Sequence, residues 1–129
     1  KRHGVIPKLS LGNPDARRDW GYAPDYMRAA RLMMDSHTPD DFVIATGKTY
    51  SIREFLYAAL EAADLPASYE NEFVAWQSPG HVRPREVPYL RGDASKAREQ
   101  LKWVAETSFS QLVTKMVIND IEIHAKASR

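Results

Sequence analysis

Residues 9–26, which read LSLGNPDARRDWGYAPDY, decide the fold of this chain. The first three residues form a short apolar alternation, and the turn-forming cluster Gly12–Asp15 follows directly, so a strand that ends in a loop is predicted. Pro24 suits the first turn of a helix, where its missing N–H leaves no bond unmade, and apolar side chains then recur at helical spacing to about Ser36. The stretch therefore predicts a strand, an arginine-bearing loop and a helix in succession.

Further along, short strands and helices are expected to alternate. Phe42–Ala45 is a β-rich apolar run and predicts a buried strand. Ser51 and Glu54 have the spacing of a capping box, in which each side chain bonds the backbone N–H of the other residue, so a helix should begin there and stop at Pro66. Residues 69–75 alternate weakly and are interpreted as another strand.

The last third of the chain is predicted to be helical. Asp93 suits the N-cap of a short helix through Leu101. Ser108 and Gln111 form a second capping-box pattern that opens the longest helix. Its buried stripe is expected to comprise Leu112, Val113, Met116, Val117, Ile121 and His124. The whole pattern favours an α/β fold with several packed helices and short strands.

Composition excludes several classes of protein. With 129 residues, 43% of them hydrophobic, the chain suits one compact domain that covers residues 1–129. Its net charge of +1 lacks the basic excess of a nucleic-acid binder. The chain has no cysteine, its four histidines have no ligand spacing, and no apolar run approaches the about 20 residues of a membrane span. We therefore expect a cytoplasmic protein with no nucleic-acid, membrane or metal partner.

The sequence lacks a cofactor-binding motif and a catalytic residue pair. The six glycines are scattered singly, so no glycine-rich turn offers a cradle for a dinucleotide pyrophosphate. No Tyr-x-x-x-Lys pair is present, so the chain has no evident base for proton abstraction coupled to hydride transfer. We expect neither a catalytic residue nor a cofactor site here. Because the sequence starts at Lys1, we also expect it to be a piece of a longer protein.

Two arginines on separate loops are the best candidates for a binding site. Arg18 follows the first strand and its turn, and Arg83 precedes Pro84, which holds its neighbour extended. Two forked guanidinium groups in one cleft can clamp a diphosphate by bidentate hydrogen bonds, and a carboxylate such as Glu86 can accept hydrogen bonds from a ribose diol. From the residues alone, a loop arginine is more often a solvated or structurally paired charge than part of a binding site.

Residues 11–26 closely resemble a block found in GDP-mannose 4,6-dehydratases. The resemblance spans about residues 9–122 and continues in order through the segments 41–47, 50–55, 83–87, 92–93, 96–97 and 101–103. These enzymes are extended short-chain dehydrogenases/reductases. The resemblance implies that the chain is the small carboxy-terminal, substrate-binding domain, and that the Rossmann half, which holds NADP and the Tyr/Lys pair, is absent.

The resemblance also assigns roles to particular residues. It implies that Arg18 and Arg83 bind the diphosphate of the sugar nucleotide and that Glu86 faces the ribose. Leu11 and Asn13 would line the nucleotide pocket. The reaction implied for the whole enzyme converts GDP-mannose to GDP-4-keto-6-deoxymannose with NADP, and the share of this domain would be to position the substrate.

Two features depart from the family pattern. Only residues 77–82 stand where the family usually has a longer insertion, which affects base selectivity, and Arg85 replaces a small hydroxyl residue. Two alternatives to the dehydratase reading stay open: a standalone module that binds a nucleotide sugar without turnover, and an interaction domain that has lost its ligand. We also expect an apolar face where the Rossmann half would pack, and hence self-association as a homo-oligomer.

Overall fold

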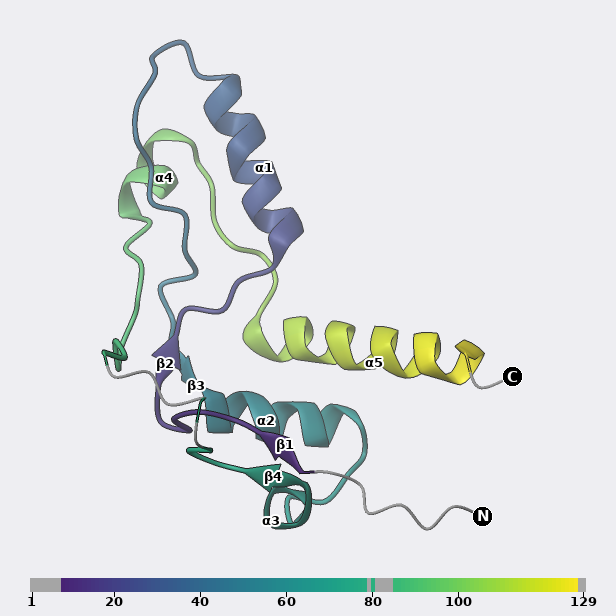
Figure 1. Cartoon of the computed structure of the whole chain (residues 1–129). Helices are drawn as coiled ribbons and strands as arrows, with labels where there is room; N and C mark the ends of the chain where they lie inside the picture. Colours follow the sequence, from purple (N-terminus) through teal and green to yellow (C-terminus); the bar gives the residue numbers. More distant parts are fainter. Residues whose placement is uncertain (1–7, 79, 81–84, 128–129) are drawn as a thin grey trace.

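The computed structural model describes residues 8–78, 80 and 85–127. In that part of the chain the elements are β1 (Leu9–Ser10), β2 (Arg17–Arg18), α1 (Ala23–Met34), β3 (Tyr50–Ser51), α2 (Ile52–Ala62), α3 (Tyr69–Phe73), β4 (Val74–Ala75), α4 (Ser95–Gln100) and α5 (Phe109–Ala127). Figure 1 shows α1 and α4 together at one end of the molecule, and α2, α3, β1 and β4 at the other. Several helices joined by very short strands confirm the predicted α/β class.

The strands form two small two-stranded sheets. β1 pairs in parallel with β4, with Leu9 opposite Val74, and β2 pairs antiparallel with β3, with Arg17 opposite Ser51. The segment 88–90 lies on the other side of β2, because the Arg17 N–H donates to the carbonyl of residue 88 and the N–H of residue 90 donates to the Arg17 carbonyl. β2 is thus held on both edges.

Both predicted capping boxes are confirmed. Ser51 Oγ accepts from the Glu54 N–H at 3.0 Å, and Glu54 Oε2 accepts from the Ser51 N–H at 2.6 Å, so α2 starts where the sequence indicates. Ser108 and Gln111 make the same reciprocal bonds at the start of α5. α2 and α5 pack together, and the ring of Phe109 stacks on Tyr50 with their centroids 3.8 Å apart.

A buried core joins α1, α4 and the chain that follows α4. Ala29 and Ala97 are fully buried, and Trp103 is only 1% exposed between them. The indole Nε1 of Trp103 donates to the carbonyl oxygen of Asp25 at 2.9 Å, so the one polar atom of this ring is satisfied. Asp93 accepts from the Ser95 N–H at 2.9 Å, although the N-cap of α4 itself is Ala94.

The carboxylate of Asp25 links residues 106–107, which precede α5, to the first turn of α1. Its Oδ2 accepts from the backbone N–H of Glu106 at 3.1 Å and of Thr107 at 2.9 Å, and its Oδ1 lies 3.5 Å from Arg28 Nη2. Burial raises the pKa of Asp25, but the hydrogen bonds from Thr107, Glu106 and Arg28 outweigh it and leave the pKa below its usual range.

The strand predicted at Phe42–Ala45 is not formed. The segment has no strand partner among the described residues, and its backbone is irregular. Phe42 and Ile44 nevertheless pack against the core around Trp103. The apolar run therefore predicted correctly that these side chains pack on the core. A strand, however, also needs a neighbouring strand to pair with, and the local sequence does not show whether one is present.

The strand predicted at residues 69–75 is wrong for its first five residues. Tyr69–Phe73 is the short helix α3, and only Val74–Ala75 forms a strand. The rings of Tyr69 and Phe73 lie 4.9 Å apart, which is the side-chain contact expected of a helical i, i+4 pair. The buried Glu70 makes tertiary contacts from this helix, and these override a weak alternation.

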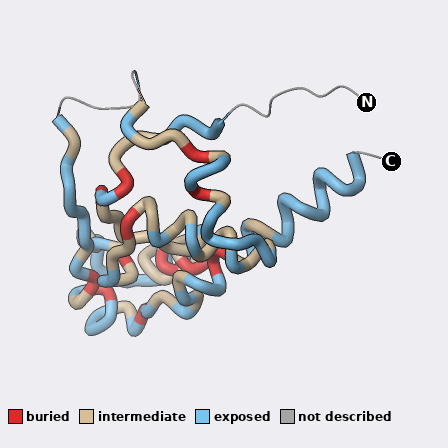
Figure 2. The backbone as a smooth tube through the Cα atoms, turned by 90° about the horizontal axis from the view of Figure 1, so that it is seen from below, coloured by how far each residue is buried: buried red, intermediate tan, exposed pale blue. Residues whose placement is uncertain are grey.

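The buried stripe predicted for α5 holds only at its start. Leu112 and Val113 are buried, but Met116 is 47% and Ile121 is 52% exposed, and His124 is also exposed. Figure 2 shows the distal half of α5 projecting away from the remaining chain, coloured almost entirely as exposed. The apolar pattern of this helix thus extends beyond the surface that α2 can cover.

Asp25 should contribute stability that is lost in acid. Its folded pKa lies below the unfolded value, so the contribution is present above about pH 4 and disappears as the pH falls toward the folded pKa. We expect Asp25→Asn to be about 1–2 kcal/mol less stable at pH 7 in urea titrations, and to lose less stability than the parent between pH 5 and pH 3. Asp35→Asn, at an exposed pair with Arg31, is the control and should follow the parent curve. Equal acid sensitivity in all three proteins would contradict this assignment.

Candidate functional site

A pocket of about 340 Å³ opens between the end of β1, β2 and the first residue of α2. Its lining comprises Ser10, Leu11, Gly12, Asn13, Ala16, Arg18, Trp20, Ile52 and Glu86. Four of the five residues predicted for substrate binding, Leu11, Asn13, Arg18 and Glu86, therefore lie on one cavity. The fifth, Arg83, lies outside the described residues.

Arg18 is anchored within this pocket by its own neighbours. Its Nη2 donates to Glu86 Oε1 at 2.5 Å, and its Nη1 lies 2.8 Å from the carbonyl oxygens of both Val87 and Arg17. The two charged side chains are about three-quarters buried, at 24% and 23% exposure. These bonds occupy three of the five N–H donors of the guanidinium and fix its plane, which leaves two donors for a bound anion.

Glu86 affects the electrostatics of the pocket in two ways. It orients Arg18, and it also neutralises much of the positive charge that a diphosphate would need. One N–H of Arg18 Nη2 is bonded to Glu86, so a phosphate would use the other Nη2 N–H or the Nε N–H. Arg85 is exposed, and no bond from it to the pocket is found among the described residues.

Asn13 and Leu11 also line this pocket. Asn13 Oδ1 accepts from the Asp15 N–H at 2.9 Å, which makes an Asx turn of the loop after β1. This bond uses the oxygen of the side chain and leaves its amide nitrogen as a donor. The Leu11 N–H donates to the Ala75 carbonyl at 2.9 Å, so a backbone hydrogen bond to β4 fixes the position of Leu11.

Asp19 is a residue that the local sequence did not single out. Its carboxylate accepts from the Thr46 N–H at 2.9 Å, the Thr46 hydroxyl at 2.5 Å, the Gly47 N–H at 2.9 Å and the Gly92 N–H at 3.2 Å. It therefore joins β2, the turn before β3 and the segment before α4. The only sequence signals were indirect: a carboxylate directly after Arg18, and glycines at two distant positions.

A second residue missed from the sequence is Glu70. It is 7% exposed and accepts hydrogen bonds from Tyr57 at 2.5 Å and Trp76 at 2.7 Å, and it is paired with Arg53. The hydrogen bond from Tyr57, with those from Trp76 and Arg53, lowers the pKa of Glu70 against the opposing effect of burial. No pattern marked it, because its partners lie on two other segments, α2 and the residue directly after β4.

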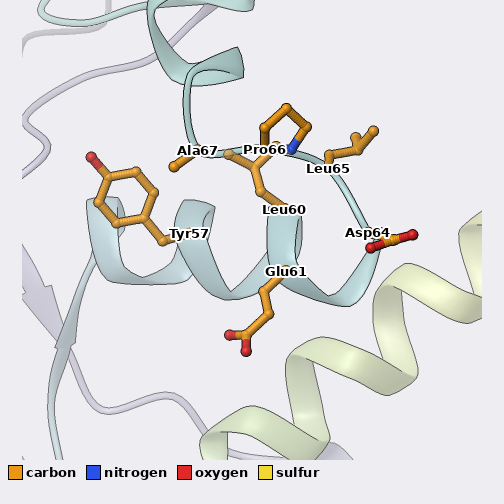
Figure 3. Close-up of a pocket in the computed structure, with 7 residues that line it drawn as sticks. All are labelled: Tyr57, Leu60, Glu61, Asp64, Leu65, Pro66 and Ala67. Atoms are coloured by element: carbon orange, nitrogen blue, oxygen red, sulfur yellow. The ribbon is translucent and has the colours of Figure 1, made fainter.

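Another hollow, of about 500 Å³, lies at the end of α2 (Figure 3). Its lining residues are Tyr57, Leu60, Glu61, Asp64, Leu65, Pro66 and Ala67. This lining carries two carboxylates and no cationic side chain, so it does not suit a phosphate ligand. The pocket beside Arg18 is smaller, but its lining includes a guanidinium group that can donate hydrogen bonds to an anion.

The described residues contain no group of three or more His, Asp or Glu side chains arranged to hold a metal ion. None of their helices has the length and apolar character needed to cross a membrane.

The fold is found in nucleotide-sugar enzymes of known structure. The UDP-glucose 4-epimerase of Thermotoga maritima superposes with a TM-score of 0.72 at 24% identity, over 95% of this chain and 36% of the epimerase. A putative epimerase from Burkholderia cenocepacia gives a TM-score of 0.75 at 25% identity, over 88% of this chain and 36% of that protein. The chain thus has the fold of extended short-chain dehydrogenases/reductases over about a third of their length.

Sequence comparison narrows this class to one family. The family model for GDP-mannose 4,6-dehydratase matches residues 2–116. GDP-mannose 4,6-dehydratases are 38% identical in Drosophila melanogaster, 39% in Homo sapiens and 42% in Dictyostelium discoideum, over 96%, 93% and 88% of this chain. The chain belongs to the GDP-mannose 4,6-dehydratase family. It spans 35–36% of the length of these relatives.

Close contact at Gly92 should be essential to the arrangement around Asp19. A Cβ built at Gly92 would lie 2.2 Å from Ala45 Cβ, which forces one segment to move. We expect Gly92→Ala to cost about 1–3 kcal/mol, as overpacking typically does, in chemical denaturation. The double variant Gly92→Ala, Ala45→Gly removes the clashing methyl and should regain part of this loss. Equal instability of the single and double variants would show that the clash is not the cause.

Proposed function

We propose that this chain is the sugar-nucleotide-binding part of a GDP-mannose 4,6-dehydratase. The observation that carries the proposal is the common pocket of Leu11, Asn13, Arg18 and Glu86, four residues to which the family resemblance gives this role. Arg18 and Glu86 are 68 positions apart in sequence, and their ion pair joins two segments that line the pocket. Family membership supports GDP-mannose as the ligand.

Binding would use the donors that Arg18 still has available. A diphosphate oxygen would bond to its remaining N–H groups, while its fixed plane reduces the entropy lost on binding. Glu86 would then divide its acceptor capacity between Arg18 and a ribose hydroxyl. Because Glu86 offsets the charge of Arg18, a second cation is needed for tight binding, and Arg83 remains our proposal for that group.

The chain would contribute position rather than chemistry to the reaction of the whole enzyme. In the whole enzyme, NADP would take up a hydride and return it during the conversion of GDP-mannose to GDP-4-keto-6-deoxymannose. The residues of this chain do not fit NADP, because they include neither a glycine-rich turn nor a Tyr-x-x-x-Lys pair. A Rossmann portion outside this chain would therefore hold NADP, and the pocket beside Arg18 would present the sugar to it.

A standalone module that binds a nucleotide sugar without turnover is the second candidate. It rests on the same pocket residues, because binding through Arg18 and Glu86 does not itself require catalytic groups. An activity assay with NADP and a supplied Rossmann portion separates the two candidates. Turnover supports the dehydratase, whereas binding without turnover supports the module.

Calorimetry with GDP-mannose, GDP and UDP tests the proposed ligand. We expect Arg18→Ala to weaken GDP-mannose binding at least tenfold, because a charge-assisted hydrogen bond contributes about 1.5–3 kcal/mol. Arg31→Ala, on the exposed face of α1, is the matched control and should bind like the parent. Unchanged affinity after Arg18→Ala and Arg83→Ala together would refute the proposal and leave the interaction domain as the remaining reading.

Self-association should follow from the uncovered part of α5. Its exposed apolar side chains are Met116, Ile118, Ile121 and Ile123, which are 47–53% exposed. We propose that in the whole protein this surface is covered, and that the isolated chain covers it by forming a homo-oligomer. Sedimentation should show association that decreases when Ile118→Gln and Ile121→Gln are combined. A monomeric parent protein at high concentration would contradict this expectation.

A further inference from the structure

Glu70 occupies an unusual place for a charged residue. It lies on α3 with its side chain 9% exposed, and its carboxylate receives hydrogen bonds from Arg53 and Tyr57 of α2 and from Trp76, directly after β4. A buried carboxylate with three donors is satisfied and ionised, and removal of one donor leaves it undercompensated. The group therefore holds three segments in one fixed arrangement.

Trp76 is held on two sides by this arrangement. Its Nε1 donates to Glu70 at 2.7 Å, and the guanidinium carbon of Arg53 lies 5.2 Å from its ring centroid. Arg53 also donates its backbone N–H to the carbonyl of Pro14 at 3.0 Å. The indole thus cannot shift without loss of a charge-assisted hydrogen bond and a cation–π contact.

The backbone on either side of Trp76 supports the pocket wall. The Leu11 N–H donates to the Ala75 carbonyl at 2.9 Å, the Gln77 N–H to the Gly12 carbonyl at 3.1 Å, and the Ser78 N–H to the Leu11 carbonyl at 3.2 Å. Leu11 and Gly12 both line the pocket beside Arg18. Figure 1 shows this relation as β4 running beside β1, with α3 adjoining β4.

We propose that Glu70 is a positioning residue for this pocket, acting through Trp76 on the wall formed by Leu11 and Gly12. Glu70 does not line the pocket, so its influence travels through the hydrogen bond to Trp76 and the three backbone bonds around it. The identity of the ligand rests on the proposed function, whereas the control of the wall does not.

The three donors to Glu70 provide an internal control. Tyr57→Phe removes a hydrogen bond to the same carboxylate, but Tyr57 lies on α2 and makes no contact with the wall that the described bonds reveal. Trp76→Phe removes the bond that reaches the wall and retains an aromatic ring. Both variants should lose stability, yet only one should change the pocket.

Amide hydrogen exchange and GDP-mannose affinity together form the test. In Trp76→Phe we expect exchange at the Leu11, Gln77 and Ser78 amides to be at least tenfold faster relative to the amides of α5, and the Kd for GDP-mannose to rise about tenfold. Tyr57→Phe should leave both quantities within about twofold of the parent. The tenfold changes expected for Trp76→Phe correspond to about one lost hydrogen bond. Glu70→Gln keeps the side-chain volume and an acceptor for Trp76, so it should give intermediate exchange.

Several results would overturn the inference. Equal effects of Tyr57→Phe and Trp76→Phe on amide exchange and on the Kd would mean that Glu70 only stabilises the fold. If Trp76→Phe and Glu70→Gln are both unfolded, the same conclusion follows. If the parent protein fails to bind GDP-mannose, the proposed function fails, but the exchange pattern still decides whether Glu70 controls the wall. Protected amides in Trp76→Phe with weakened binding would refute the route through the backbone.

Discussion

The carboxylate of Asp19 is the constraint on which the arrangement of this molecule depends. Four hydrogen bonds to it join the strand that carries Arg18, the turn at Thr46 and Gly47, and the segment at Gly92. The strands themselves are only two residues long, so ladder pairing contributes little to holding these segments together. A single carboxylate bonded to backbone amides does so instead, and it holds the residue next to Arg18 in place beside the pocket.

Local chemistry made much of the helical structure predictable. The capping boxes at Ser51 and Ser108 marked helix starts correctly, because both partners of each box lie within one turn. The strand predicted at Phe42–Ala45 failed for the opposite reason, since pairing depends on a distant partner. Glu70 lies in a segment whose helical form is set by contacts with α2 and Trp76, and no local pattern contains that information.

The candidate site was predictable only in part. A loop arginine such as Arg18 has many uses, and its composition and spacing left a structural role open. The family resemblance selected Leu11, Asn13, Arg18, Arg83 and Glu86. Four of these residues line one pocket, and Arg83 lies outside the described residues. The resemblance did not predict the ion pair between Arg18 and Glu86. Through this pair Glu86 orients the Arg18 side chain and also offsets the charge that would attract an anionic ligand.

The pairing of β1 with β4 has a consequence for how the molecule assembles. Leu9 and Val74 are partners in a parallel ladder although 64 residues separate them along the chain. Closing so long a loop carries a large entropic cost that local helix formation does not share. Helices such as α2 can form early, whereas the wall at Leu11 exists only after this distant pairing is made. We therefore expect the cavity to form after the local helices when the polypeptide folds.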